Sequence, residues 1–295
     1  MINRKTNCLT LVKKRIVCTR DLILSSESLF IGARVAVTLA FLIYASWRDF
    51  EVREVSNRVW VIYAPVALAL SLSDLLLFET SKLPLFGISV SLTVGLAFLL
   101  FYSGGFGGAD SKALMCIAVA LPFAPEILST PALIGGLSPI SQVIFPLTIF
   151  SNAVLFAAAS GIYMILRNFV WHKRTGKKMF TGSLGHEPVW RKILVMITGY
   201  KVTVAKLKAK WHVFPMEDVT DDVGNGLNRK LVVVPRDEGC DKIVERLSNA
   251  VDAKKIDSYV WATPGLPMLI FVTLGLIVAL VFGDVVWLFV RFLLG

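Results

Sequence analysis

The sequence predicts an all-α polytopic membrane protein with about six transmembrane helices and a small α+β cytoplasmic insertion. Of its 295 residues, 55% are hydrophobic and only 18% are charged, and the mean hydropathy is +0.68. A soluble domain would carry roughly 25% charged residues. The apolar residues gather in long runs separated by short polar loops, which is the pattern of membrane spans. The lipid bilayer is therefore an expected partner of this chain.

The apolar runs define the predicted elements in chain order. A basic segment at 1–28 comes first, and we interpret it as an uncleaved amino-terminal extension. Six runs follow, most of them near the roughly 20 residues that a helix needs to cross the bilayer core: 29–47, 59–78, 83–103, 113–134, 141–166 and 264–294. Five predicted spans thus occupy residues 29–166, and the sixth occupies residues 263–295.

Two of these runs carry residues that interrupt a helix. Pro122 and Pro125 interrupt the fourth run, so its end is not defined by the sequence. The last run is long enough to be tilted, or to be broken near Gly283 and Asp284.

Residues 167–262 form a polar stretch that we interpret as a folded insertion. Its first part is strongly basic, and a β-like run follows at 229–235. A helix-like segment covers about 240–256, where four apolar residues share one helical face: Ile243, Val244, Leu247 and Val251. This aliphatic content predicts a small α+β core.

The distribution of charge predicts the orientation. By the positive-inside rule, the basic block at 167–210 is cytoplasmic. Counting back through five spans places the loops 48–58 and 104–112 on the same side. The basic extension at 1–28 would then lie outside, which conflicts with the rule. We keep the orientation because the 167–210 block carries more positive charge.

Several classes of site lack the residues they need. None of the four cysteines belongs to a CxxC pair, and the three histidines show no HExxH spacing. We therefore expect no metal and no other cofactor. The net charge of +10 is read as cytoplasmic loops and contact with anionic lipids. No nucleic-acid partner is predicted.

Two aspartates carry the predicted chemistry. Asp49 closes the first span, Asp110 opens the fourth, and the predicted orientation places both on one face of the membrane. Two close carboxyls cannot both ionise, so one keeps its proton. The ionised group then takes a proton from water, and the neutral group donates to the scissile carbonyl. Peptide hydrolysis by such a pair needs neither a metal nor a side-chain nucleophile.

The residues before Asp110 suit close contact with a substrate backbone. Gly105, Gly107 and Gly108 allow close backbone approach and positive φ values, and a broken helix start leaves backbone N–H groups free. Lys112 would orient or partly neutralise Asp110. A simpler interpretation stays open for both acids, since an aspartate at a span end is most often a solvated interfacial residue.

The sequence around both acids resembles the archaeal prepilin and preflagellin peptidases, the archaeal branch of the type IV prepilin peptidase family. Three segments carry the resemblance: Asp49–Asn57, which includes Arg53, then Gly105–Lys112, and Trp261–Pro267 before the last span. Ala109 replaces a glycine of the bacterial form, which is typical of the archaeal branch. The paired CxxC motifs of the methylating bacterial enzymes are missing, so methyl transfer is not implied.

The resemblance implies an aspartic endopeptidase with Asp49 and Asp110 as its catalytic dyad. The implied substrates are pilin-like or archaellin precursors with a short basic leader before a hydrophobic helix. Cleavage would occur at the cytoplasmic face of the cell membrane. Glu51 and Glu54 would attract the leader, although both also fit a solvated loop.

Other functions stay open at this point. A small transporter or channel would use the charges of Arg34, Asp74 and Asp284 within the spans. Against it, no internal repeat is visible. Arg34 is near a span end and can extend toward an interface, and we expect Asp74 to lie near the outer interface. A membrane scaffold is a further alternative. The sequence Pro131-Ala-Leu133 resembles an element of presenilin-like proteases only by chance, because it follows Asp110 too closely.

Overall fold

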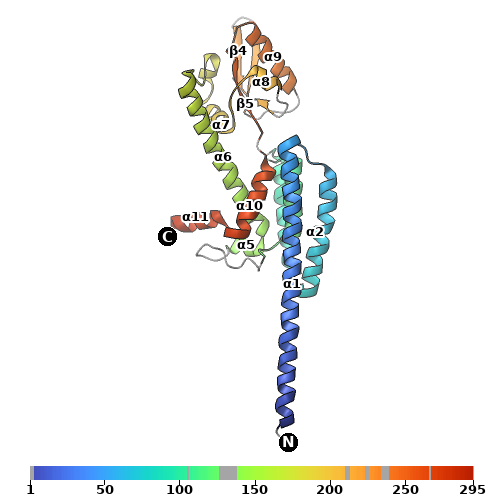
Figure 1. The fold of residues 1–295 in the computed structure, drawn as a ribbon. Helices are drawn as coiled ribbons and strands as arrows, with labels where there is room; N and C mark the ends of the chain where they lie inside the picture. The colour runs from blue at the N-terminus through green and yellow to red at the C-terminus, as the bar shows by residue number, and fades with distance from the viewer. Residues whose placement is uncertain are drawn as a thin grey trace. The chain divides into compact units, whose positions relative to one another are not determined.

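The computed structural model describes residues 3–104, 106–125, 138–209, 213–222, 226–233, 239–265 and 267–294 (Figure 1). Side chains are described from Ser26 onward, apart from those at 221–222 and 226–227. The chain forms two compact units. The first contains Met1–Phe156 and Pro267–Gly295, and the second contains Ala157–Leu266.

The first unit is a helical bundle. Its helices are α1 (Asn3–Val52), α2 (Asn57–Phe78), the short η1 (Thr80–Lys82), α3 (Leu83–Tyr102), α4 (Gly108–Ala120), α5 (Pro139–Val143), the start of α6 (Phe145–Thr175), α10 (Met268–Phe282) and α11 (Val285–Leu294). Helices α1, α2, α4 and α10 share a core, in which the fully buried side chains include Leu42, Tyr63, Ile117 and Leu276. Large apolar side chains such as Leu77 and Leu99 remain exposed on the outer faces, where lipid would cover them.

The described residues contain four helices that are long and apolar enough to cross a membrane, at Ser26–Val52, Asn57–Phe78, Thr80–Tyr102 and Phe145–Thr175. A fifth span results if the bent pair α10 and α11 counts as one. The protein is thus mostly helical and multi-pass. Helix α4 ends at Ala120, directly before Leu121 and Pro122, and the rest of the predicted fourth span, with the segment 131–133, lies largely outside the described residues.

The predicted break near Gly283 and Asp284 is confirmed. Helices α10 and α11 meet there at 61°. Gly283 has φ +77°, which favours glycine. The freed backbone groups find partners, because Asn152 donates to the Gly283 carbonyl at 3.0 Å and accepts from the Val285 N–H at 3.1 Å. Asp284 accepts from the Trp287 N–H at 2.9 Å. This bend is a hydrogen-bonded part of the fold.

The charges Arg34 and Asp74 form a buried ion pair between α1 and α2. The Arg34 Nε also donates to the carbonyl of Ala120 on α4 at 2.8 Å. Both partners lie near helix ends, Asp74 close to the end of α2 and Ala120 in the last turn of α4. Asp74 is also buried, with 7% of its surface exposed.

The second unit contains the rest of α6 and a small α+β fold. Its sheets are β1–β5–β2 and β3–β4, all antiparallel. The strands are β1 (Tyr200–Thr203), β2 (Phe214–Pro215), β3 (Glu217–Asp222), β4 (Gly226–Leu231) and β5 (Tyr259–Thr263). The further helices are η3 (Gly182–His186), α7 (Val189–Thr198), α8 (Val204–Ala209) and α9 (Cys240–Asp252).

The predicted helix at 240–256 is α9, which ends at Asp252, and its predicted apolar face packs into the unit's core. The predicted β-run at 229–235 is only partly a strand. Strand β4 ends at Leu231, and Pro235 lies outside the described residues.

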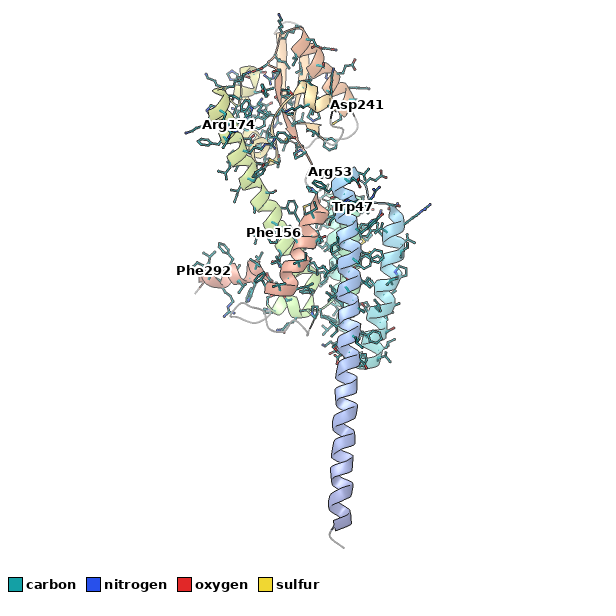
Figure 2. All side chains as sticks on the ribbon, viewed as in Figure 1. Trp47, Arg53, Phe156, Arg174, Asp241 and Phe292 are labelled. Carbon is teal, nitrogen blue, oxygen red and sulfur yellow. The ribbon has the colours of Figure 1, made fainter. Side chains whose placement is uncertain are left out.

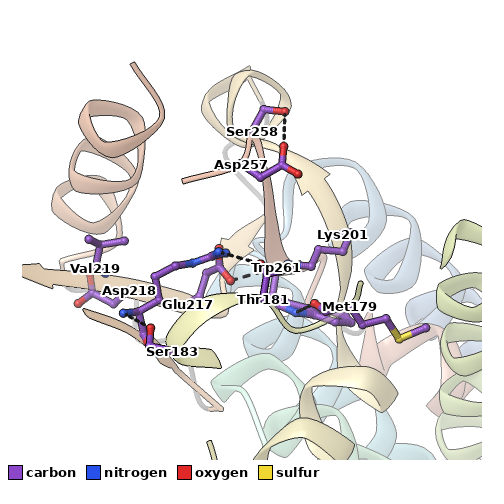
Figure 3. Close-up of polar contacts among 11 residues, drawn as sticks. Met179, Thr181, Ser183, Lys201, Glu217, Asp218, Val219, Asp257, Ser258 and Trp261 are labelled. Atoms are coloured by element: carbon purple, nitrogen blue, oxygen red, sulfur yellow. Dashed lines mark hydrogen bonds and ion pairs between the residues drawn. The ribbon is translucent and has the colours of Figure 1, made fainter. Parts of the chain in front are cut away.

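A buried polar cluster joins the strands of this unit (Figure 3). Glu217 is fully buried and accepts a hydrogen bond from Arg229 Nη2 at 2.7 Å. The Lys201 ammonium lies 3.9 Å from the same carboxylate and 5.0 Å from the centre of the Trp261 ring. Burial lowers the pKa of Lys201 to about 8, against a partly compensating attraction to Glu217.

Candidate active site

Asp49 lies in the last turn of α1, at the end of the bundle where Trp47 and Arg53 are labelled in Figure 2. The helix ends at Val52, and Arg53 follows with φ +56°, an uncommon conformation for a residue other than glycine. The Ser56 hydroxyl accepts from the Arg58 N–H at 3.4 Å and caps the start of α2. The chain therefore reverses within four residues.

Asp110 lies in the first turn of α4, where its carboxylate accepts from the Gly107 N–H at 3.1 Å. A Cβ atom on Gly107 would stand only 3.0 Å from that carboxylate oxygen. Glycine at 107 therefore permits this hydrogen bond. A Cβ on Gly108 would make only ordinary contact, 3.7 Å from the Phe101 ring. Gly105 lies outside the described residues.

A side-chain hydrogen bond links the two aspartate segments. The Lys112 ammonium donates to Asn57 Oδ1 at 2.6 Å, which joins the first turn of α4 to the first residue of α2. Asp49 and Asp110 also lie close enough for their charges to interact. Both acids are only partly buried. The structure thus brings the two predicted acids to the same end of the bundle.

The amino terminus of α10 completes this end. The backbone N–H of Leu269, in the first turn of α10, forms a hydrogen bond to the Asp49 carboxylate. Thr273, one turn later, bonds to Ser46 on α1 at 2.7 Å between their hydroxyl oxygens. The positive end of a helix dipole stabilises a nearby carboxylate anion. Helix α10 therefore offsets part of the effect of burial on the Asp49 carboxylate.

Arg53 supplies a positive charge beside Asp49. Its charge acts on that carboxylate, while its Nε is buried without a hydrogen-bond partner among the described residues. Lys112, in contrast, binds Asn57 rather than either acid. Within the described ranges neither aspartate forms an ion pair, so the two carboxyls interact without a directly bonded cation.

Sequence reasoning missed two groups of this site, Asn57 and the Leu269 N–H. Asn57 ends the first of the three segments that carry the family resemblance, but only the fold shows that Lys112 reaches it. Pro267 indicated where the last helix begins, but no sequence pattern predicts that the first turn of this helix contacts Asp49. Within the described ranges, no group of three or more His, Cys, Asp or Glu residues is placed to hold a metal ion.

Two like charges in a partly buried site favour sharing one proton. Such a pair titrates as a unit, with one carboxylate available as a base and one carboxylic acid as a proton donor. Both side chains are partly exposed, so water can reach them. This arrangement suits acid–base hydrolysis of an amide bond.

Comparison with known proteins places both acids within one family match. Residues 36–166 match the model of the Type IV leader peptidase family, and residues 191–285 match the model described as Archaeal Peptidase A24 C-terminus Type II. A preflagellin peptidase of Methanococcus voltae is 30% identical over 256 residues, which cover 84% of this chain and 94% of that protein. A preflagellin peptidase of Methanococcus maripaludis strain C6 is 25% identical over 248 residues, which cover 82% and 92%.

Proposed function

Because this chain belongs to the Type IV leader peptidase family and is a membrane protease that processes precursor leaders, we propose that Asp49 and Asp110 form its catalytic dyad. The observation that carries the proposal is the meeting of two like charges from α1 and α4 at one end of the bundle. The bond between Lys112 and Asn57 supports it, since it ties the two motif segments together.

The surroundings suggest different roles for the two acids. Asp49 receives the Leu269 N–H and the charge of Arg53, and both oppose the effect of burial on its carboxylate. We therefore assign Asp49 as the base that activates water. Asp110 keeps the shared proton and donates it to the carbonyl oxygen of the scissile bond. When the amine leaves, it takes the proton that Asp49 accepted from water, and a hydroxyl of the intermediate returns its proton to Asp110 as the new carboxyl group forms.

The proposed substrates are archaellin or pilin-like precursors, as the names of the two preflagellin peptidases suggest. Their basic leader would approach the acidic loop after α1. Glu54 is exposed there, and Glu51 is exposed while it pairs with Arg48 at 3.3 Å. A surface pair of this kind is weak and exchanges readily with another cation.

The proposed layout has six spans, formed by α1, α2, α3, the α4 region, α6, and α10 with α11. The dyad and the insertion at 167–262 lie on the cytoplasmic side, as the basic block after α6 favours. Residues 1–28 are an extension, 29–166 hold the first five spans, and 263–295 hold the sixth.

The transporter alternative receives no support from the charges on which it rested. Arg34 and Asp74 bind each other, and Asp284 binds Ser138 at 2.9 Å and the Trp287 N–H. All three are therefore engaged in holding helices together.

Co-expression with a leader-bearing precursor tests the proposal. Asp49→Asn and Asp110→Asn should each abolish leader removal while the protein remains in the membrane. Asp241→Asn, an exposed change on α9, is the matched control and should process normally. Leader removal near the wild-type rate in either dyad variant would refute the catalytic assignment. Sequencing the new amino terminus identifies the cleaved bond.

A further inference from the structure

The second unit contains a basic pocket that the peptidase reaction does not use. It has a volume of about 480 Å³ and lies between the carboxyl-terminal part of α6 and the strands β1 and β5. Five of its lining residues fall on one face of α6, at spacings of three and four residues: Arg167, Val170, Trp171, Arg174 and Thr175. Arg174 is labelled on α6 in Figure 2.

Three cations of the basic pocket have no carboxylate partner within the described residues: Arg167, Arg174 and Lys206. The two acids whose charges act on Lys201, another residue of the pocket lining, are already paired with other cations. Asp257 binds Lys177 at 2.7 Å, and Glu217 binds Arg229 and Lys201 in the buried cluster. The pocket therefore has an uncompensated positive charge, which is a site for an anion.

Aromatic rings line the pocket, and one of them holds a cation in place. The Arg167 guanidinium lies 3.8 Å from the centre of the Tyr200 ring. Trp171 meets Tyr259 edge to face, with 5.5 Å between ring centres. A guanidinium stacked on a ring keeps its N–H edge free, and that edge fits two oxygens of a phosphate. The pocket is thus preorganised for a phosphate group.

The pocket lies where the apolar part of α6 ends. Exposed Ile162, Leu166 and Val170 form an apolar strip, spaced four residues apart, that leads to Arg167 and into the pocket. Residues of α6 up to Thr175 belong to one of the candidate spans. Arginine and aromatic residues at the end of such a span mark the headgroup region of a bilayer.

Helix α7 gives a second indication that the pocket lies at the level of the bilayer interface. A Cβ on Gly161 would stand 2.8 Å from Ile197 Cγ2, so α7 packs directly on the apolar part of α6. Asn168 holds the end of α7 with hydrogen bonds to the carbonyls of Met196 and Gly199, at 3.0 and 2.7 Å. The helix exposes four apolar side chains: Val189, Trp190, Ile193 and Leu194. Such a face on a basic amphipathic helix is typical of insertion at the bilayer interface.

We propose that the basic pocket binds the phosphate of an anionic lipid headgroup, with an acyl chain along the Ile162, Leu166 and Val170 strip. Arg167 and Arg174 donate to the phosphate oxygens, and Lys206 adds charge from the other wall. A basic leader peptide is excluded from this pocket by charge. The inference does not depend on the catalytic roles of Asp49 and Asp110.

The test uses the full-length protein in a neutral detergent and two short-chain lipids, dihexanoyl-phosphatidylglycerol and dihexanoyl-phosphatidylcholine. Native mass spectrometry measures the retained lipid. The wild type should retain phosphatidylglycerol about tenfold more tightly than phosphatidylcholine, because only the anionic lipid offers a net negative phosphate to two arginines. Equal retention of both lipids would overturn the proposal.

Two matched double variants distinguish binding in the pocket from a general effect of positive charge on the protein. Arg167→Gln with Arg174→Gln should weaken phosphatidylglycerol binding about tenfold, through the loss of charge-assisted hydrogen bonds. Lys173→Gln with Lys178→Gln removes the same charge from exposed residues that do not line the pocket, and should bind as the wild type does. An equal loss in both doubles contradicts a defined site.

Two further arms complete the test. Inorganic phosphate and glycerol 3-phosphate should compete only weakly; competition as strong as that of the lipid would make this a site for soluble anions instead. Thermal unfolding checks that the variants are folded. If the arginine double does not fold, Lys206→Gln on the exposed face of α8 serves in its place, with a several-fold loss of phosphatidylglycerol expected; unchanged binding in that variant would count against the site.

Discussion

Helices α1, α2 and α4 meet at two charged sites, and the two sites use charge in opposite ways. At one, Arg34 of α1 and Asp74 of α2 form a buried ion pair, and Arg34 also binds the Ala120 carbonyl in the last turn of α4. At the other, Asp49 of α1 and Asp110 of α4 bring like charges together, and Lys112 is directed to Asn57 of α2.

The difference shows how a pair of charges that stabilises the fold differs from a pair that can react. Opposite charges with complete hydrogen bonding hold three helices in place and leave nothing to react. Like charges in partial contact with water keep a proton mobile, and the fold must restrain them by other contacts. Those contacts are weaker: one backbone N–H on each acid and one side-chain bridge between the helices.

The largest expected effect is on catalysis by the dyad. Asp49→Ala and Asp110→Ala should each lower kcat/KM for a leader-bearing precursor by at least about a thousandfold, since acid–base groups that act as a unit each carry most of the effect. The double variant should be no slower than the worse single variant. Initial cleavage rates of the purified proteins measure this, and multiplying losses in the double variant would show that the two acids act independently.

The second effect is on stability at the ion pair. Arg34→Met leaves Asp74 buried without its partner and should lower the free energy of unfolding by about 3 kcal/mol. Arg34→Met combined with Asp74→Leu should recover most of that loss, because the buried charge is then gone. Denaturant unfolding in detergent measures both. A double variant as unstable as the single one would mean that packing, rather than charge, dominates this site.

A smaller effect is expected at the bridge between the two aspartate segments. Lys112→Met should lower kcat/KM about fivefold to tenfold, because one hydrogen bond to a charged group contributes roughly 1 kcal/mol at an exposed position. Asn57→Ala should cost about the same, and the double variant no more. Arg58→Gln, exposed and next in sequence, is the control. If the losses of kcat/KM in the two single variants add up in the double variant, Lys112 and Asn57 act independently and the bridge between them has no role.

The smallest effect concerns an exposed pair in the second unit. The hydrogen bond from Lys177 lowers the pKa of Asp257. The pair therefore stabilises the fold fully at pH values above the ordinary pKa of aspartate, and this stabilisation is lost as the pH falls through the lowered pKa. Lys177→Gln should cost under about 1 kcal/mol at pH 7 and still less at about pH 3. Thermal unfolding at the two pH values measures the difference, and a larger loss at the acidic pH would contradict this assignment.

The sequence predicted the helices well because a membrane imposes long apolar runs. The bounds of α2 and α3 follow the runs at 59–78 and 83–103 within two residues. The break at Gly283 was also visible, since a glycine beside an acid interrupts an otherwise continuous run. The span count was harder to predict, because α4 is only 13 residues long and part of the fourth run is not described.

Partners between distant segments could not be predicted in the same way. The pair of Arg34 and Asp74 was not predicted, because nothing local in the sequence links two residues forty positions apart. The same holds for Lys112 with Asn57 and for Asp49 with Leu269. Periodicity reports which face of a helix is apolar, whereas side-chain pairs depend on the rotation and height of each helix against its neighbours.

The lengths of α4 and α10 have a consequence for the membrane itself. With 13 and 15 residues, these helices extend only about 20 and 22 Å along their axes, against a hydrocarbon core of about 30 Å. Both begin at the dyad. Where lipid reaches α4, and α10 before its bend into α11, it would meet a hydrophobic mismatch of roughly 8–10 Å, which thinning of the bilayer or entry of water would relieve. A locally thinned bilayer would help a protease of this kind, because water must reach the peptide bond next to the lipid.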